Sequence, residues 1–197
     1  MTDIEQIREL EKIAFNAWPA QERVNVGGGW IFRATSGITR RANSVFPIHE
    51  LVGIDVEGGI KKAIEFYRRR NLIPRFQMTK ASQPHGLDKI LEDANFTKEL
   101  CVSIQEVTLG SLVLNESKIE VKLHSRPNVA WLGTYASCGE FDRFSLEKRK
   151  SIMERVTQAK VFATALVDGQ AVGVGIGVCE GDWLGLFALA TLQKHRR

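Results

Sequence analysis

The run AVGVGIGVC (Ala171–Cys179), the turn EGD (Glu180–Asp182) and the run WLGLFALATL (Trp183–Leu192) form the stretch that decides the fold. The first run alternates β-branched residues with glycine, which is typical of a buried strand whose backbone another group can approach closely. Charge and glycine in the next three residues indicate a turn. The second run is apolar on both faces, as a central strand is. We therefore predict a strand, a turn and a second strand, followed by the basic end QKHRR (Gln193–Arg197).

Upstream of this stretch, strand-like and helix-like segments alternate around one polar break. The break is Gly110–Ser117, where Gly, Ser, Asn and charge separate two periodic regions. It predicts two modules, residues 1–112 and residues 118–197. The second module has a hairpin turn at Asp168-Gly169. Its other expected elements are the strands Ile119–Leu123 and Val161–Val167 and the helices Asn128–Cys138 and Leu146–Val156.

The first module shows helical and strand periodicity in turn. Its first helix ends before Pro19, because proline cannot continue a helix. A hairpin follows, with a turn at Ser36-Gly37. The expected helices are Asp3–Trp18, Glu57–Asn71 and Pro84–Asn95, and the expected strands are Trp30–Thr35, Ile38–Pro47, Pro74–Thr79 and the long Phe96–Leu109.

Two features of the first module allow both a structural and a functional interpretation. Gly27-Gly28-Gly29 could be a phosphate-binding loop, but no strand-then-helix context surrounds it, so a plain loop before a strand is favoured. A polar set further on could form a binding rim. The favoured interpretation makes its arginines a solvated face and its Asn and Ser turn or backbone caps. The set consists of Arg33, Arg40, Arg41, Asn43 and Ser44.

Composition and cysteine spacing set the broad class. The 197 residues are 44% hydrophobic and 25% charged, with a net charge of +4, which is an ordinary globular balance with a mild basic excess. That excess suits an anionic ligand and equally suits an ordinary solvated surface. Cys101, Cys138 and Cys179 show no metal-ligand spacing, so we expect no metal site and buried thiols in a reducing cytoplasm. Neither a signal peptide nor a membrane-spanning run is expected.

Two segments resemble the GCN5-related N-acetyltransferase superfamily. One is LATLQKHR (Leu189–Arg196), which follows the decisive strands, and the other is GWIFRATSGITRRANSVFP (Gly29–Pro47), which is similar to the N-terminal half of tandem acetyltransferase-like proteins. The resemblance implies an α+β fold of the acyl-CoA N-acyltransferase type. Its mixed, largely antiparallel sheet is flanked by helices, in two related modules of which the second is incomplete.

The resemblance also implies acetyl transfer from acetyl-CoA to an amine of a small molecule or a peptide. It places the thioester beside the strand positions Phe187, Leu189, Ala190 and Thr191. In the superfamily, Arg196 would open a Q/R-x-x-G-x-G/A loop whose backbone N–H groups hold the pyrophosphate, and Arg197 follows it.

The sequence ends at Arg197, before the glycines of that loop. We therefore expect weak acetyl-CoA binding and impaired activity for residues 1–197. No catalytic residue is assigned, since the possible bases are candidates only because they can ionise. They are Glu106, His124, Glu140, Glu180 and Asp182.

Alternatives to an enzyme remain open at this point. A non-catalytic dimerisation or regulatory module is the second interpretation, and a basic nucleic-acid-binding protein is a third, less favoured one. The final strand Trp183–Leu192 is apolar and would lack neighbours, so either the first module covers it or two chains share it. The shared contact is favoured, which predicts a homo-oligomer.

Overall fold

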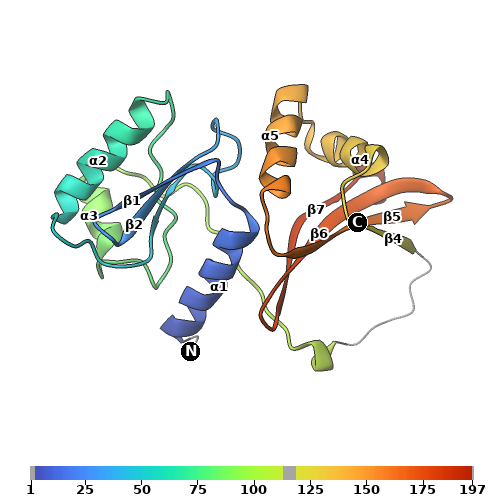
Figure 1. The fold of residues 1–197 in the computed structure, drawn as a ribbon, viewed down its shortest axis with the longest axis horizontal. Helices are drawn as coiled ribbons and strands as arrows, with labels where there is room; N and C mark the ends of the chain where they lie inside the picture. Colours follow the sequence, from blue (N-terminus) through green and yellow to red (C-terminus); the bar gives the residue numbers. More distant parts are fainter. Residues whose placement is uncertain (1–2, 113–118, 197) are drawn as a thin grey trace.

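The computed structural model describes residues 3–112 and 119–196, and within them it contains two separate antiparallel sheets. The first has the strand order β1-β2-β3 and the second has the order β4-β5-β6-β7. Figure 1 shows the two sheets in two halves of the molecule, with the first helix, α1, between them. The α+β class, with antiparallel sheets flanked by helices, is confirmed.

The first half holds three of the helices and three short strands. These elements are α1 (Ile4–Ala17), β1 (Glu22–Val26), β2 (Trp30–Ala34), β3 (Val45–Pro47), α2 (Val56–Arg68) and α3 (Leu87–Asp93). A short 3₁₀ turn, η1 (Leu109–Ser111), precedes the second half. Asp3 and Asp55 begin α1 and α2 as N-caps, each accepting a hydrogen bond from a backbone N–H of the first turn.

The second half is a four-stranded meander with two helices inserted after its first strand. Its elements are β4 (Glu120–His124), α4 (Val129–Gly139), α5 (Arg143–Glu154), β5 (Ala159–Val167), β6 (Gln170–Glu180), β7 (Trp183–Thr191) and the 3₁₀ turn η2 (Gln193–His195). The turn Asp168-Gly169 has both φ angles positive, at 50° and 75°, as the expected two-residue hairpin requires. The predicted strand, turn and strand of the decisive stretch are therefore confirmed as β6 and β7.

The triple glycine forms the turn of a hairpin that the sequence did not reveal. β1 pairs with β2 in an antiparallel register that places Val24 opposite Phe32. A Cβ on Gly29 would lie 1.9 Å from the carbonyl oxygen of Glu50, so only glycine fits there. The plain-loop interpretation of the glycines is thus the better one. β1 was missed because it is an edge strand whose three central residues are exposed and include only one apolar side chain, Val24.

Two strands predicted in the first half are wrong or much shorter. Of the predicted strand Ile38–Pro47, only β3 forms. The Asn43 side chain hydrogen-bonds the backbone groups of the preceding residues, which would otherwise be free to pair in a sheet. Its Oδ1 accepts from the N–H groups of Thr35 and Gly37, and its Nδ2 donates to two carbonyls, so Asn43 is the predicted cap. Of Pro74–Thr79 only Phe76 forms a β-bridge, to Val45 of β3.

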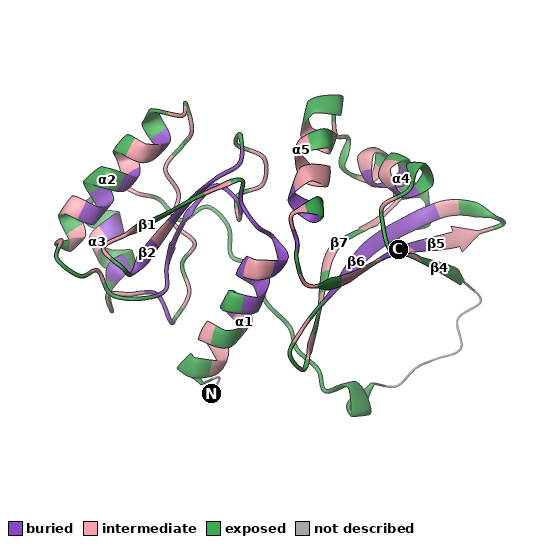
Figure 2. Cartoon of the chain, viewed as in Figure 1, coloured by how far each residue is buried: buried purple, intermediate pink, exposed green. Residues whose placement is uncertain are grey.

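The long strand predicted over Phe96–Leu109 is also wrong. Among the described residues, no backbone group of residues 97–107 makes a hydrogen bond to another backbone group. Figure 2 shows this connection exposed, in green, while the centre of β6 is buried. The strand pattern is present, but the chain places no partner strand beside it.

One core cluster joins the two halves. On the inner face of the second sheet, Phe162 and Ile176 pack with Trp131 of α4 and Ile152 of α5. Trp18, at the end of α1, belongs to the same cluster and is 8% exposed. Three further members from the first half are Ala17, Ala20 and Ala42. The predicted boundary between residues 112 and 118 falls mostly outside the described residues and stays a prediction.

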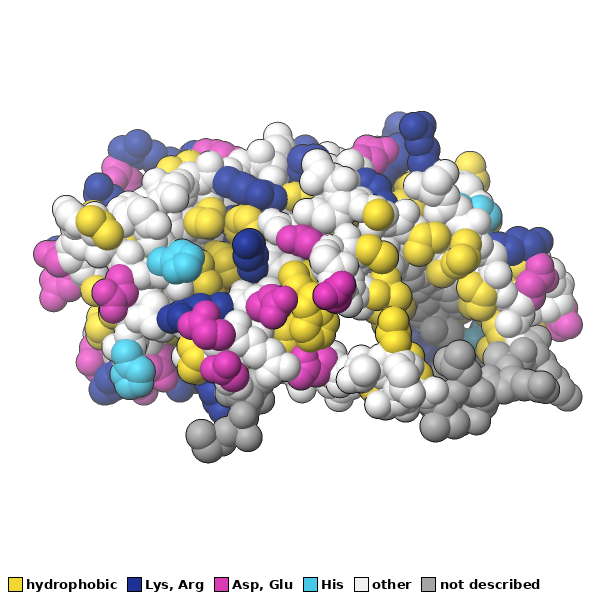
Figure 3. All heavy atoms as spheres, turned by 60° about the horizontal axis from the view of Figure 1, so that its bottom comes forward, with side chains coloured by type: hydrophobic (Ala, Val, Ile, Leu, Met, Phe, Trp, Pro, Cys, Tyr) yellow, Lys and Arg dark blue, Asp and Glu magenta, His cyan; other side chains and the backbone are white. Residues whose placement is uncertain are grey.

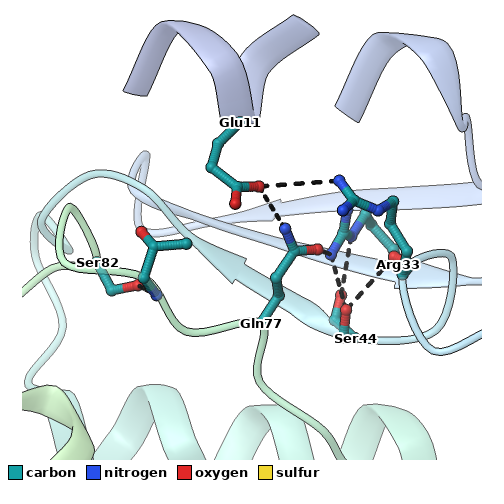
Figure 4. Close-up of polar contacts among 7 residues, drawn as sticks. Glu11, Arg33, Ser44, Gln77 and Ser82 are labelled. Carbon is teal, nitrogen blue, oxygen red and sulfur yellow. Dashed lines mark hydrogen bonds and ion pairs between the residues drawn. The ribbon is translucent and has the colours of Figure 1, made fainter. Parts of the chain in front are cut away.

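A buried polar network fastens α1 to the first sheet (Figure 4). Glu11 of α1 accepts a hydrogen bond from Gln77 at 2.5 Å, and Gln77 in turn accepts one from Arg33 of β2 at 2.8 Å. Arg33 also donates to the hydroxyl and the carbonyl of Ser44. The prediction of a solvated face is wrong for Arg33, which is 1% exposed and lies beside the rings of Phe15 and Phe46.

The charged side chains in and around this network differ in how far they are buried, and burial shifts the pKa values of two of them. Burial lowers the pKa of Arg33 to about 9, and burial also raises the pKa of Glu11, against the pull of Arg41 and Arg33. Arg41 approaches Glu11 at 3.9 Å, whereas Arg40 is exposed and pairs with Glu99. The solvated-face interpretation therefore holds for Arg40 alone of the three arginines.

Candidate functional site

The second sheet carries a β-bulge in its last strand. Val174 of β6 pairs with Ala190, and Ile176 pairs with Phe187, so Gly175 alone faces the two residues Ala188 and Leu189 of β7. Ala188 has a φ of 50°, a left-handed conformation that is costly for a residue with a Cβ. Bulges of this kind break the regular ladder and re-aim neighbouring groups, and they are common beside active sites.

The bulge borders a pocket of about 650 Å³. Its floor is made of small residues, because alanines of β5 lie next to glycines of β6 in the register. These alanines and glycines alternate along the strands with buried residues of the core cluster, while Val174 of that cluster and Cys138 of α4 also border the pocket. Figure 3 shows a hollow bordered by hydrophobic side chains on this part of the molecule. The lining residues are Val121, Cys138, Ala163, Ala165, Gly173, Val174, Gly175, Leu189, Ala190, Thr191 and Arg196.

Arg196 brings the only cation of the described lining to the end of the pocket. Its Nε donates to the carbonyl oxygen of Thr191 at 2.6 Å, and its Nη2 donates to that of Cys138, the penultimate residue of α4, at 3.1 Å. These two bonds hold the residue after η2 against the end of α4. A guanidinium has five N–H groups, so further donors remain for an anionic oxygen.

Cys138 is the other ionisable side chain of the described lining. Burial raises the pKa of its thiol, and the nearby Arg196 only partly opposes this. At neutral pH the side chain is therefore a neutral thiol rather than a reactive thiolate. It adds polarisable, apolar surface to the pocket wall.

The predicted cofactor-binding residues do not all meet in this pocket. Leu189, Ala190, Thr191 and Arg196 line it together. Phe187 instead packs against the core cluster on the other side of the bulge. Arg197 lies outside the described residues.

None of the five candidate bases lines the pocket. Glu180 accepts a hydrogen bond from Asn16 of α1, and Glu106 accepts one from Gln6. His124 lies 3.3 Å from the side chain of Asn128, and Glu140 ends α4 in a left-handed conformation. Asp182 is exposed in the turn between β6 and β7. The described lining contains no carboxylate and no imidazole.

Sequence reasoning missed most of the pocket floor. Gly173 and Gly175 belong to the glycine alternation that predicts close approach to a backbone, so a signal for them was present. Ala163 and Ala165 enter through the β5–β6 register, and Cys138 enters through the packing of α4, which no local pattern encodes.

Within residues 3–112 and 119–196, no group of three or more His, Cys, Asp or Glu side chains is placed to hold a metal ion. No described helix is both long and apolar enough to span a membrane.

Comparison with known families decides the family of this chain. Residues 4–197 match the family model described as "Probable histone acetyltransferase Rv0428c C-terminal". The chain belongs to this acetyltransferase family. This match, together with the relatives described next, confirms the resemblance to GCN5-related N-acetyltransferases.

One curated relative and two solved structures are similar to this acetyltransferase-family chain. The "Uncharacterized N-acetyltransferase YobR" of Bacillus subtilis (strain 168) is 29% identical over 201 residues, covering 98% of this chain and 77% of the relative. A GCN5-related N-acetyltransferase from Kribbella flavida has a TM-score of 0.62 at 14% identity, covering 100% of this chain and 76% of that structure. A conserved protein of unknown function from Staphylococcus epidermidis ATCC 12228 has a TM-score of 0.52 at 10% identity, over 94% and 77% of the two chains.

Proposed function

We propose that this protein transfers an acetyl group from acetyl-CoA to an amine, with the donor bound in the pocket beside β7. The observation that carries the proposal is the bulge at Ala188, which interrupts the β6–β7 ladder at the wall of an apolar pocket. A strained, non-glycine residue at such a position is typical of functional sites. Family membership supports the reaction class.

The lining fits the apolar part of the donor. A flat floor of glycine and alanine leaves room for an acyl thioester and its extended arm, and Leu189 borders that room. Arg196 stands at the end of the pocket with N–H groups able to meet a phosphate oxygen. Backbone N–H groups released from the ladder by the bulge would polarise the thioester carbonyl, as in other acyl-transfer sites.

The reaction would form an N–C bond and break the C–S bond, with one proton leaving the amine and one reaching the departing thiolate. Acetyl-CoA supplies the activated acetyl group. The described lining offers a neutral thiol and a guanidinium and no carboxylate or imidazole, so we assign no general base. The chain's own contribution is binding, orientation and carbonyl polarisation.

The acceptor is proposed to be an amine of a small molecule or of a peptide. The family description names a histone acetyltransferase, so a lysine-containing peptide is the first acceptor to test, next to small primary amines. Three free thiols support the further proposal of a reducing, cytoplasmic compartment.

Cysteine protection tests the donor site directly. Cys138 lines the pocket, whereas Cys101 and Cys179 are exposed outside it. Acetyl-CoA should slow alkylation of Cys138 at least about threefold at ligand concentrations above its Kd and leave the other two rates unchanged. Equal rates at all three cysteines with millimolar acetyl-CoA would contradict the proposed site.

Two glycine variants provide a matched pair for the same assay. A Cβ at Gly175 would lie 2.7 Å from Cδ2 of Leu189 and would push that side chain, whereas a Cβ at Gly133, exposed on α4 and outside the pocket lining, would meet no atom within 4 Å. We expect Gly175→Ala to reduce protection of Cys138 and Gly133→Ala to preserve it. Activity is then measured as the release of CoA in the presence of an amine acceptor. Weak acetyl-CoA binding by residues 1–197 stays a prediction, and the dependence of Cys138 protection on acetyl-CoA concentration measures it.

A further inference from the structure

Residues 97–107, in the connection between the two halves, alternate apolar and polar side chains as a strand does, and they are exposed to solvent. Their apolar side chains are open to solvent, with exposed fractions of 66% for Leu100, 68% for Val102 and 46% for Ile104. None of the backbone groups of residues 97–107 bonds to another backbone group in the part of the chain that the structure describes. Both the apolar side chains and the backbone are therefore available for pairing.

The segment is held in place by its other polar residues. Glu99 accepts hydrogen bonds from Arg40 at 3.2 Å and from Arg75 at 3.3 Å, which tie the segment's first residues to the first half. Figure 1 shows the connection running from α3 behind the first half and then past α1 towards η1. At the other end, Glu106 accepts a hydrogen bond from Gln6 of α1, so side chains tie both ends of the segment, and no described strand covers it.

The order of residues makes the segment complementary to itself. In KELCVSIQE (Lys98–Glu106), apolar residues alternate with polar ones around Val102, with a base at one end and an acid at the other. Antiparallel pairing of two copies about Val102 would place Lys98 opposite the partner's Glu106 and Leu100 opposite the partner's Ile104. Val102 would then lie opposite the partner's Val102. Parallel pairing would bring like charges together at both ends, which is unfavourable.

We propose that this segment is a homodimer interface, in which Lys98–Glu106 pairs antiparallel with the same segment of a second copy across a two-fold axis. Opposite-charge and apolar cross-strand pairs then fall on one face of a two-stranded ribbon. The dimer is independent of the acetyl-CoA pocket, since none of these residues lines it. Because one strand pair is a small interface, the dimer forms at micromolar rather than nanomolar protein concentrations.

Charge exchange tests the pairing on the full chain. Lys98 has 84% of its side chain exposed and lies 3.8 Å from Asp88, and Glu106 is exposed and accepts from Gln6, so each change alters one surface contact and leaves the core intact. Sedimentation equilibrium should show a concentration-dependent dimer for the natural sequence. Lys98→Glu should weaken it about tenfold or more, since it places two acids opposite each other at both ends, and adding Glu106→Lys should restore it. A monomer at about 0.5 mM, or no rescue by the double variant, would overturn the proposal.

Disulfide trapping tests the register. Antiparallel pairs have Cα atoms about 4.5–5.5 Å apart, which fits a disulfide, so Val102→Cys in a background with the three native cysteines changed to Ser should cross-link to itself. Gln105→Cys in the same background is the control, because that residue would lie opposite the partner's Glu99, roughly 20 Å from its own copy. Equal cross-linking at the two positions would overturn the proposal. So would a dimer that Val102→Cys does not trap, since another surface, such as the edge of β7, would then be responsible.

Discussion

Ala188 is the one residue of the β7 bulge that adopts a strained, left-handed backbone conformation. Its φ of 50° is easy for glycine but costs about 1–2 kcal/mol for alanine, and a β-branched side chain tolerates it less well. The strain persists because Phe187 is packed into the core on one side and Ala190 pairs with Val174 on the other.

Replacing Ala188 by valine should therefore lower the free energy of unfolding by about 1–3 kcal/mol. Ala159→Val is the control, since Ala159 is exposed at the start of β5 and valine suits a strand. Urea denaturation of both variants gives the comparison. A stable Ala188→Val variant would mean that β7 can relax its bulge.

Glu11 gives the stability a dependence on pH. Burial raises the pKa of its carboxyl in the folded state above the ordinary value of 4.5, so the folded state binds the proton more tightly than the unfolded state does. This contribution to stability is present in full below pH 4.5 and is lost as the pH rises through the raised value. Glu11→Gln should flatten that part of the stability profile.

Urea denaturation at a series of pH values between about 4 and 8 measures the slope. Glu147→Gln serves as the control, because Glu147 is exposed on α5. An unchanged slope in the Glu11 variant would assign the pH dependence to another group.

The sequence predicted the residues of the candidate site that lie at the end of β7 and just after it, but not the lining residues that come from β4, α4 and β5. Leu189, Ala190, Thr191 and Arg196 were identified through a local pattern, and they meet in one pocket. Phe187 was included as one of the strand positions that the resemblance places beside the thioester, but it packs against the core cluster before the bulge and does not line the pocket. Arg33 was misjudged, since an arginine in a strand reads as exposed unless its partners Ser44 and Gln77 are known.

Among the elements, strand patterns succeeded where the chain supplies a neighbour. β5, β6 and β7 follow one another through tight turns, so each pattern finds its partner locally. The segment 96–109 has an equally good pattern, but pairing depends on what lies beside it. β1 shows the reverse case, because its weak pattern becomes a strand through the glycine hairpin that joins it to β2.

The edge of β7 behaves partly as the sequence predicted. Leu184, Leu186 and Leu189 are 47%, 62% and 68% exposed. The first half covers only the start of the strand, where Glu9 of α1 accepts a hydrogen bond from Trp183. A shared contact through this strand stays a prediction, separate from the interface proposed at Lys98–Glu106.

Across the whole molecule, Trp18 makes the two halves depend on each other. It is 8% exposed in a cluster whose other members come mostly from α4, α5, β5 and β6. Trp18→Ala should cost about 3–5 kcal/mol and should destabilise both halves in a single transition.

Amide exchange under increasing urea resolves the two sheets separately and provides the measurement. Val52→Ala, at a position 75% exposed, should change stability by less than about 0.5 kcal/mol. Loss of protection in the second sheet alone, with the first sheet unaffected, would show that the halves unfold independently.

The position of Trp18 also bears on how the chain is made. The cluster that it belongs to extends to Val178, so this cluster cannot close until the chain has been made past that residue and has left the ribosome. At the usual rates of synthesis, roughly 10–30 seconds separate the appearance of the two ends of that cluster. During this interval the end of α1 exposes an indole ring with no second half to receive it. The nascent protein should therefore be a substrate for ribosome-associated chaperones, and slowing translation should increase its aggregation rather than relieve it.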